Sequence, residues 1–193
     1  MEKNAFNQHI RPALTCLALF TILFGIAYPA GIFLINQILY KEKADGSLIF
    51  KKDEVIGSKL IGQPFLSARY FWSRPSATDY PYNAAASAGA NWGSANPELL
   101  DNIRKRIDQL HALAPKNKKQ IPVDLLAASA SGLDPHISLA AALYQAPRVA
   151  ISRKIPEDQV VTLIQKHTEK RQWGFLGEPC VNVLQLNLDL DAL

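Results

Sequence analysis

The chain has 193 residues, of which 48% are hydrophobic and 20% are charged, and its formal net charge is +4. This length suits one folded domain plus an appendage, and the composition is that of an ordinary folded protein. The basic residues are scattered and form no stripe interleaved with aromatic residues, which argues against a nucleic-acid-binding protein.

The first feature along the chain is a long apolar stretch. No charged residue lies between Arg11 and Lys41, and the intervening residues are rich in Leu, Ile, Phe and Ala. A helix that crosses a membrane needs about 20 such residues, so we expect one transmembrane helix over residues 12–40. Within it, the small residues Ala30 and Gly31 allow a neighbouring helix to approach closely, and we predict a packing face there.

A cleaved signal peptide is the alternative for this stretch. Lys3 and Arg11 offer a basic start, residues 14–24 an apolar core, and residues 25–27 small side chains at a cleavage spacing. The apolar run continues through residues 32–39, beyond any such cleavage site. This length favours an uncleaved anchor.

The anchor divides the chain into a tail over residues 1–11, the helix over residues 12–40, a connector over residues 41–56, and one soluble domain over residues 57–193. More lysines follow the helix than basic residues precede it: Lys41, Lys43, Lys51 and Lys52. The positive-inside rule then predicts a cytoplasmic soluble domain, although long domains cross membranes largely regardless of charge.

Three helices in the soluble domain are predicted from their first residues. Asn96 followed by Pro97 begins one helix, as an N-cap and a first-turn proline. Ser138 caps a second helix, which we expect to end before Pro147. A third opens at residues 156–158, where two acidic residues suit the positive end of the helix dipole.

The clearest strand signal lies at the C-terminus. Leucine alternates with polar residues over positions 184–190, a pattern that predicts a half-buried strand. Short segments near Leu48, Ile61 and Val149 are its candidate partners. We therefore expect an α+β protein: one transmembrane helix, then a single mixed α+β domain with a small sheet.

Ser129, Ser131, Asp134 and His136 are close together in the sequence. They allow the hypothesis of a membrane-tethered serine hydrolase, in which either serine is the nucleophile. Such a triad must converge in space, which proximity in the sequence does not supply, and no G-x-S-x-G elbow is present. A turn is the favoured interpretation, because glycine and proline follow these polar residues.

Metal and nucleotide sites are not predicted. The chain has four histidines and two cysteines, and none has the spacing of a helical or zinc-type ligand set. Cys16 lies in the apolar stretch and Cys180 in the soluble domain, so no intrachain disulfide is expected. Neither of the two glycine-rich phosphate-binding motifs occurs. We expect no catalytic residue, no metal and no cofactor of its own.

An aromatic segment in the soluble domain is open to two interpretations. Tyr70, Phe71, Trp72 and Arg74 have the composition of interface anchors. A local aromatic core has the same composition.

Several longer motifs then resemble one family. They include GSKLIGQPF at 57–65, YFWSRPSA at 70–77, Tyr82-Asn83, NPELL after Ala95, PVDLLAASASGLDPHIS at 122–138, QAPRVA at 145–150 and GFLGEPCVNVLQLNLDLD at 174–191. The chain is similar, over almost its whole length, to the C subunit of the Kdp potassium-transporting P-type ATPase.

This resemblance implies a function that no single motif indicates. The family's complex imports potassium at the expense of ATP, and its partners are a channel-like, potassium-binding subunit and an ATP-hydrolysing P-type subunit. The C subunit is a non-catalytic accessory protein. It assists assembly and acts as a catalytic chaperone that raises the ATP affinity of the P-type subunit, while the complex handles ATP and potassium.

The resemblance also implies a location in the bacterial inner membrane, with the N-terminus in the cytoplasm, the soluble domain outside and membrane lipid around the helix. This orientation is opposite to that predicted from the lysines. On this basis we expect the partner interface to involve Tyr70, Trp72, Arg74, Asn83, Asp134 and His136.

Overall fold

The structure is a computed structural model and describes residues 6–193. Residues 1–5, which include Lys3 of the predicted cytoplasmic tail, lie outside the described residues. The chain divides into two compact units, one ending at Leu48 and one covering Ile49–Leu193. Each unit is described by itself.

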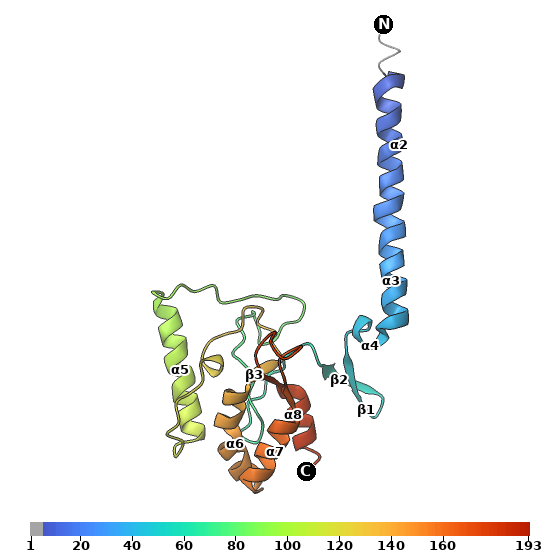
Figure 1. Cartoon of the computed structure of the whole chain (residues 1–193). Coiled ribbons are helices and arrows are strands. Elements are labelled where there is room, and N and C mark those ends of the chain that lie inside the picture. Colours follow the sequence, from blue (N-terminus) through green and yellow to red (C-terminus); the bar gives the residue numbers. More distant parts are fainter. Residues whose placement is uncertain (1–5) are drawn as a thin grey trace. The chain divides into compact units, whose positions relative to one another are not determined.

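The N-terminal unit is one long helical rod (Figure 1). It runs through η1 (Phe6–Ile10), α2 (Arg11–Phe20), η2 (Thr21–Ala27) and α3 (Tyr28–Leu39), followed by the short α4 (Lys41–Ala44). Residues Gln8–Leu39 are long and apolar enough to cross a membrane. At about 1.5 Å per residue, these 32 residues extend about 48 Å, more than the ~30 Å of a hydrocarbon core. The predicted membrane-capable helix is therefore present.

The C-terminal unit is an α+β domain, as predicted. Its helices are α5 (Pro97–Leu113), η3 (Val123–Leu125), α6 (Leu139–Arg153), α7 (Glu157–Lys166) and α8 (Val183–Leu190). A two-stranded sheet joins β1 (Leu48–Lys51) to β2 (Glu54–Ser58). A three-stranded antiparallel sheet has the order β3-β5-β4, from β3 (His136–Ser138), β4 (Thr168–Glu169) and β5 (Cys180–Asn182).

The predicted helix starts are confirmed. The Asn96 side chain accepts a hydrogen bond from the Glu98 backbone N–H at 2.9 Å, at the start of α5. The Ser138 hydroxyl accepts one from the Ala141 N–H at 3.0 Å, at the start of α6. The third helix, α7, begins at Glu157.

The predicted end of α6 is wrong, because Pro147 lies inside the helix. An interior proline costs about 3 kcal/mol, and tertiary contacts on its C-terminal side offset this. Val149 is fully buried, and the buried guanidinium of Arg148 donates hydrogen bonds to the carbonyl oxygens of Ala68 and Tyr70.

The predicted C-terminal strand is also wrong, because residues 183–190 form α8. The Asn182 side chain caps this helix by accepting a hydrogen bond from the Gln185 N–H at 3.1 Å. Its inward face has the helical spacing 183, 186, 187 and 190. Asn187 is the polar member that hides this spacing in the sequence. Of the expected pairing partners, Leu48 begins β1, which pairs with β2, whereas Ile61 is in no strand and Val149 is in α6.

The core of the domain lies where α6 packs against α7 and α7 against α8. Phe71 and Trp72 join this core from an extended segment that belongs to neither sheet. The Asn187 side chain accepts from the Phe71 N–H (2.9 Å) and donates to its carbonyl oxygen (3.0 Å). Gln145 does the same for Trp72, at 2.8 and 3.1 Å. These two side-chain amides make the backbone hydrogen bonds that a neighbouring strand would otherwise make. We call residues 70–72 the clamped segment.

Candidate functional site

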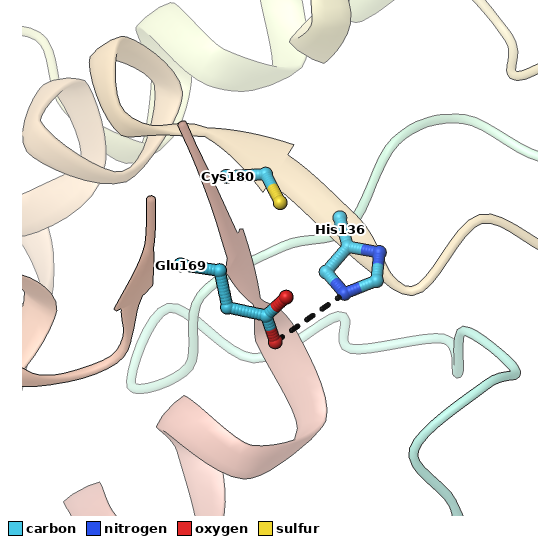
Figure 2. A group of neighbouring side chains, drawn as sticks. All are labelled: His136, Glu169 and Cys180. Atoms are coloured by element: carbon cyan, nitrogen blue, oxygen red, sulfur yellow. Dashed lines mark ion pairs between the residues drawn. The ribbon is translucent and has the colours of Figure 1, made fainter. Parts of the chain in front are cut away.

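Three chemically active side chains converge on the three-stranded sheet, and each strand contributes one of them. His136 comes from β3, Glu169 from β4 and Cys180 from β5 (Figure 2). Cys180 pairs with Ser138 on one side and with Glu169 on the other. His136 is two residues from Ser138, so all three side chains lie on one face. We call them the sheet cluster.

The distances within the sheet cluster are short. The ligand-type atoms of the three side chains all lie within 4.8 Å of one another. The His136 Nε2 is 3.9 Å from a carboxylate oxygen of Glu169, and Figure 2 shows these two groups facing each other beside the Cys180 thiol. The His136 side chain is 32% exposed and that of Glu169 is 60% exposed, so solvent reaches the cluster.

Asp134 lies beside the other ring nitrogen of His136, Nδ1. Its Oδ1 accepts a hydrogen bond from the His136 backbone N–H at 2.9 Å and lies 3.7 Å from the ring Nδ1. Its Oδ2 accepts from the Arg74 guanidinium at 3.1 Å. A Cβ at Gly62 would lie only 2.6 Å from the Asp134 carbonyl oxygen. Glycine at position 62 therefore lets its own segment approach the turn that positions Asp134.

These contacts shift the ionisation of the cluster. The Asp134 carboxylate beside the ring raises the pKa of His136, and the nearby Glu169 adds to this effect. Partial burial works to raise the pKa of Asp134, but the contacts with His136 and Arg74 outweigh it and lower that pKa. Burial raises the pKa of the Cys180 thiol, as do the charges of Glu169 and Asp134. The electrostatic potential at His136 and Cys180 is therefore negative.

The hydrolase hypothesis gains no support from this geometry. Ser129 is only 3% exposed. The Ser131 hydroxyl accepts a hydrogen bond from the Leu133 N–H, as in a turn. Among the contacts of residues 6–193, no hydrogen bond joins either serine hydroxyl to His136. Asp134 is engaged by Arg74 and by the backbone of its own turn.

The structure separates the predicted interface residues into two groups. Trp72 is 6% exposed and Asn83 is 8% exposed. The Trp72 ring lies 4.6 Å from the Arg106 guanidinium and 5.4 Å from that of Arg148, within its own domain. Both residues therefore offer a partner little surface.

The other four predicted interface residues are partly exposed: Tyr70, Arg74, Asp134 and His136. The Tyr70 hydroxyl donates to Asp191 at 3.0 Å, and Arg153 lies over its ring at 4.9 Å. In the other unit, Gly31 has no atom within 4 Å of where a Cβ would stand. The face that holds Ala30 and Gly31 is therefore open. Partner contacts by any of these residues stay predictions.

Sequence reasoning missed Glu169 and Cys180 as neighbours of His136. They are 33 and 44 positions away along the chain, and only the pairing of three very short strands brings them together. Val181, a β-branched residue next to Cys180 that is fully buried in β5, is the one local signal of a strand there. The two-residue strand that carries Glu169 has no recognisable pattern of its own.

One membrane-capable helix joined to an α+β domain defines the class of this protein. Comparison with known proteins identifies the family. A family model described as KdpC, the c chain of K⁺-transporting ATPase, matches residues 10–192. The chain is 53% identical over 187 residues to a potassium-transporting ATPase KdpC subunit of Methylococcus capsulatus, which covers 96% of this chain and 98% of the relative.

Two further relatives are also potassium-transporting ATPase KdpC subunits. A KdpC subunit of Dechloromonas aromatica is 51% identical over 185 residues, covering 95% of this chain and 97% of the relative. One from Serratia proteamaculans is 51% identical over 187 residues, covering 96% and 99%. The chain therefore belongs to the KdpC family of potassium-transporting ATPase subunits.

Proposed function

We propose that this chain is a non-catalytic accessory subunit of an ATP-driven potassium uptake pump. It assists assembly and acts as a catalytic chaperone that raises the affinity of the P-type subunit for ATP. The observation that carries this proposal is the family match, which extends from residue 10 to residue 192 and so includes both the apolar helix and the α+β domain. The partners are the channel-like, potassium-binding subunit and the ATP-hydrolysing P-type subunit.

The helix is an uncleaved anchor in a bacterial inner membrane, with its N-terminus in the cytoplasm and the α+β domain outside. Two observations support the anchor. The family match begins inside the helix at residue 10, and the helix continues without interruption through Leu39. Its large apolar side chains are exposed within this chain, as lipid or a partner helix requires.

A domain outside the membrane cannot contact cytoplasmic ATP. The ATP effect therefore passes through the partner subunits as a coupling free energy between separate sites. The absence of a glycine-rich phosphate-binding motif from the sequence fits this indirect role. ATP and potassium belong to the complex, and this chain needs neither of them as its own cofactor.

Exposed polar and aromatic residues of the α+β domain support docking on the channel-like subunit. His136 and Tyr70 are partly exposed. Trp173 and Phe175 are 85% and 67% exposed on the loop between β4 and β5. Exposed aromatic side chains are enriched at protein interfaces.

The decisive experiment compares the ATPase activity of the two larger subunits with and without this chain. The proposal predicts that the apparent KM for ATP rises about fivefold or more without the chain, in the usual range of coupling between sites, while kcat changes less. An unchanged KM in an assembled complex would contradict the chaperone role.

A second comparison separates this proposal from the hydrolase hypothesis. A complex that carries Ser129→Ala or Ser131→Ala should keep the wild-type KM for ATP. The full chain should also resist labelling by an active-site serine reagent, and specific labelling of either serine would favour the hydrolase.

A further inference from the structure

We propose that His136, Glu169 and Cys180 form a binding site for a divalent cation of the zinc type, which fastens the three strands of the sheet together. The family resemblance does not imply this site, and the inference does not depend on the proposed function. It rests on the sheet register, on the distances and on the chemistry of the three side chains.

The geometry is close to that of a zinc site. Zinc binds nitrogen and carboxylate oxygen at about 2.0–2.2 Å and sulfur at about 2.3 Å, so two ligands on one tetrahedral ion lie about 3.3–3.7 Å apart. The His136 Nε2 and a Glu169 oxygen are already 3.9 Å apart. The widest separation in the cluster is 4.8 Å or less. The Glu169 side chain is 60% exposed, so it has room to rotate toward the ion.

The histidine is oriented as a ligand histidine. In zinc sites the ring nitrogen that does not bind the metal faces a carboxylate or a carbonyl oxygen, which fixes the ring and its tautomer. Here Nδ1 lies 3.7 Å from Asp134, and Nε2 faces Glu169. Arg74 in turn holds the Asp134 carboxylate. Asp134 is therefore the positioning residue of the site.

The ligand set and its charges select the ion. One nitrogen, one oxygen and one sulfur ligand suit zinc, whereas magnesium and calcium prefer oxygen alone. Within the described part of the chain, the ion pair recorded for Glu169 is with His136 and not with a lysine or arginine. Three protein ligands leave a fourth position for water or a group from a partner.

The site explains how three such short strands keep their register. The two outer strands, β3 and β4, each pair with β5 and not with each other. β4 has only two residues, so it offers few backbone hydrogen bonds. A cation held by one side chain from each strand joins β3 directly to β4.

The test uses the full-length chain in detergent, stripped with a chelator and titrated with Co²⁺. We expect one Co²⁺ per chain, with the visible bands of a tetrahedral ion, a thiolate-to-cobalt charge-transfer band, and displacement of both by Zn²⁺. Cys180→Ser should remove the charge-transfer band, and His136→Gln should remove tight binding. Asp134→Asn should weaken binding by about 10–100-fold, as expected when a ligand histidine loses its partner.

Matched controls come from the same chain. Cys16→Ser removes the other cysteine, which lies in the apolar helix. His167→Gln removes a histidine that contacts Asp189 instead. Both should bind Co²⁺ like the wild type. The proposal is overturned if the wild type shows no thiolate band, if the band survives in Cys180→Ser, or if Cys16→Ser removes it.

A second measurement is independent of whether the variants fold. Zn²⁺ should slow the alkylation of Cys180 in the wild-type chain and leave that of Cys16 unchanged, with both positions read by mass spectrometry. Equal alkylation of Cys180 with and without Zn²⁺ would also overturn the proposal.

Discussion

Two aromatic segments of the α+β domain have similar compositions and opposite environments. In the clamped segment Phe71 is fully buried and Trp72 is 6% exposed, whereas Trp173 and Phe175 in the β4–β5 loop are 85% and 67% exposed. The difference arises from how each backbone satisfies its hydrogen bonds. Asn187 and Gln145 bind the backbone of the clamped segment inside the core.

The β4–β5 loop satisfies its own backbone instead. Gln172 and Leu176 exchange backbone hydrogen bonds of 2.8 and 2.9 Å. Between them the chain turns at Trp173 and Gly174, both of which have positive φ. A turn closed in this way needs no partner from the core, and its side chains stay outside. Composition alone therefore does not separate core aromatics from surface aromatics, and polar side chains elsewhere in the chain decide the outcome.

The largest expected effect comes from the clamped segment itself. Phe71→Ala should lower the free energy of unfolding by about 3–5 kcal/mol, because it removes a fully buried ring. Phe175→Ala is the matched control and should change it by no more than about 0.5 kcal/mol. Denaturant unfolding of the full chain measures both. Similar losses in the two variants would contradict the comparison.

The Asn187 side chain, which binds the backbone of the clamped segment, should have the next largest effect on the free energy of unfolding. Asn187→Leu leaves the buried N–H and carbonyl of Phe71 without partners, which should cost about 2–6 kcal/mol of stability, since each unsatisfied group costs about 1–3 kcal/mol. Asn102→Leu changes the same residue type on the exposed face of α5 and should be near neutral. A stable Asn187→Leu variant would show that burial alone holds the clamped segment.

A smaller, pH-dependent effect concerns the end of α8, the helix that carries Asn187. The Asp189 carboxylate lies 2.8 Å from His167 and 3.1 Å from Lys166. These two contacts lower the pKa of Asp189 below its unfolded value of about 3.9. The contribution to stability is therefore present above that value and is lost as the pH falls through the folded pKa.

Because the Asp189 side chain is 43% exposed, this contribution should stay below about 1 kcal/mol. Unfolding of the wild type and of Asp189→Asn, followed as a function of pH, measures it. The difference should be greatest near neutral pH and should vanish in acid. A difference that grows as the pH falls would contradict the assignment.

The β4–β5 loop should have the smallest effect on stability and a larger effect on assembly of the complex. Replacing Trp173 and Phe175 together by alanine should leave the unfolding free energy within about 1 kcal/mol of wild type, because neither side chain is buried. The same variant should reduce the amount of chain recovered with the channel-like subunit. Recovery of the variant with the channel-like subunit at the wild-type level would show that these two aromatic side chains do not contribute to that interface.

The sequence predicted the parts of the fold that depend on local patterns. The apolar helix, the caps at Asn96 and Ser138 and the start of α7 all follow from neighbouring residues. The α+β class is also confirmed, although the strand from which it was predicted, over residues 184–190, is the helix α8. The C-terminal helix was missed because Asn187, a polar residue, occupies a core position in order to bind the clamped segment.

The candidate site was predicted only in part, for the same reason. Asp134 and His136 stand out in the sequence because they share one turn. Glu169 and Cys180 join them only through strand pairing between residues more than 30 positions apart. Long-range pairing of two- and three-residue strands leaves no periodic pattern that a sequence analysis can use.

Co-purification tests the central claim, membership of the pump, most directly. The tagged full-length chain is produced together with the rest of the pump in a bacterial membrane, extracted in mild detergent and captured. The proposal predicts that a channel-like potassium-binding subunit and a P-type ATPase are recovered with it in a fixed ratio. Recovery of the folded chain without either subunit would contradict the account.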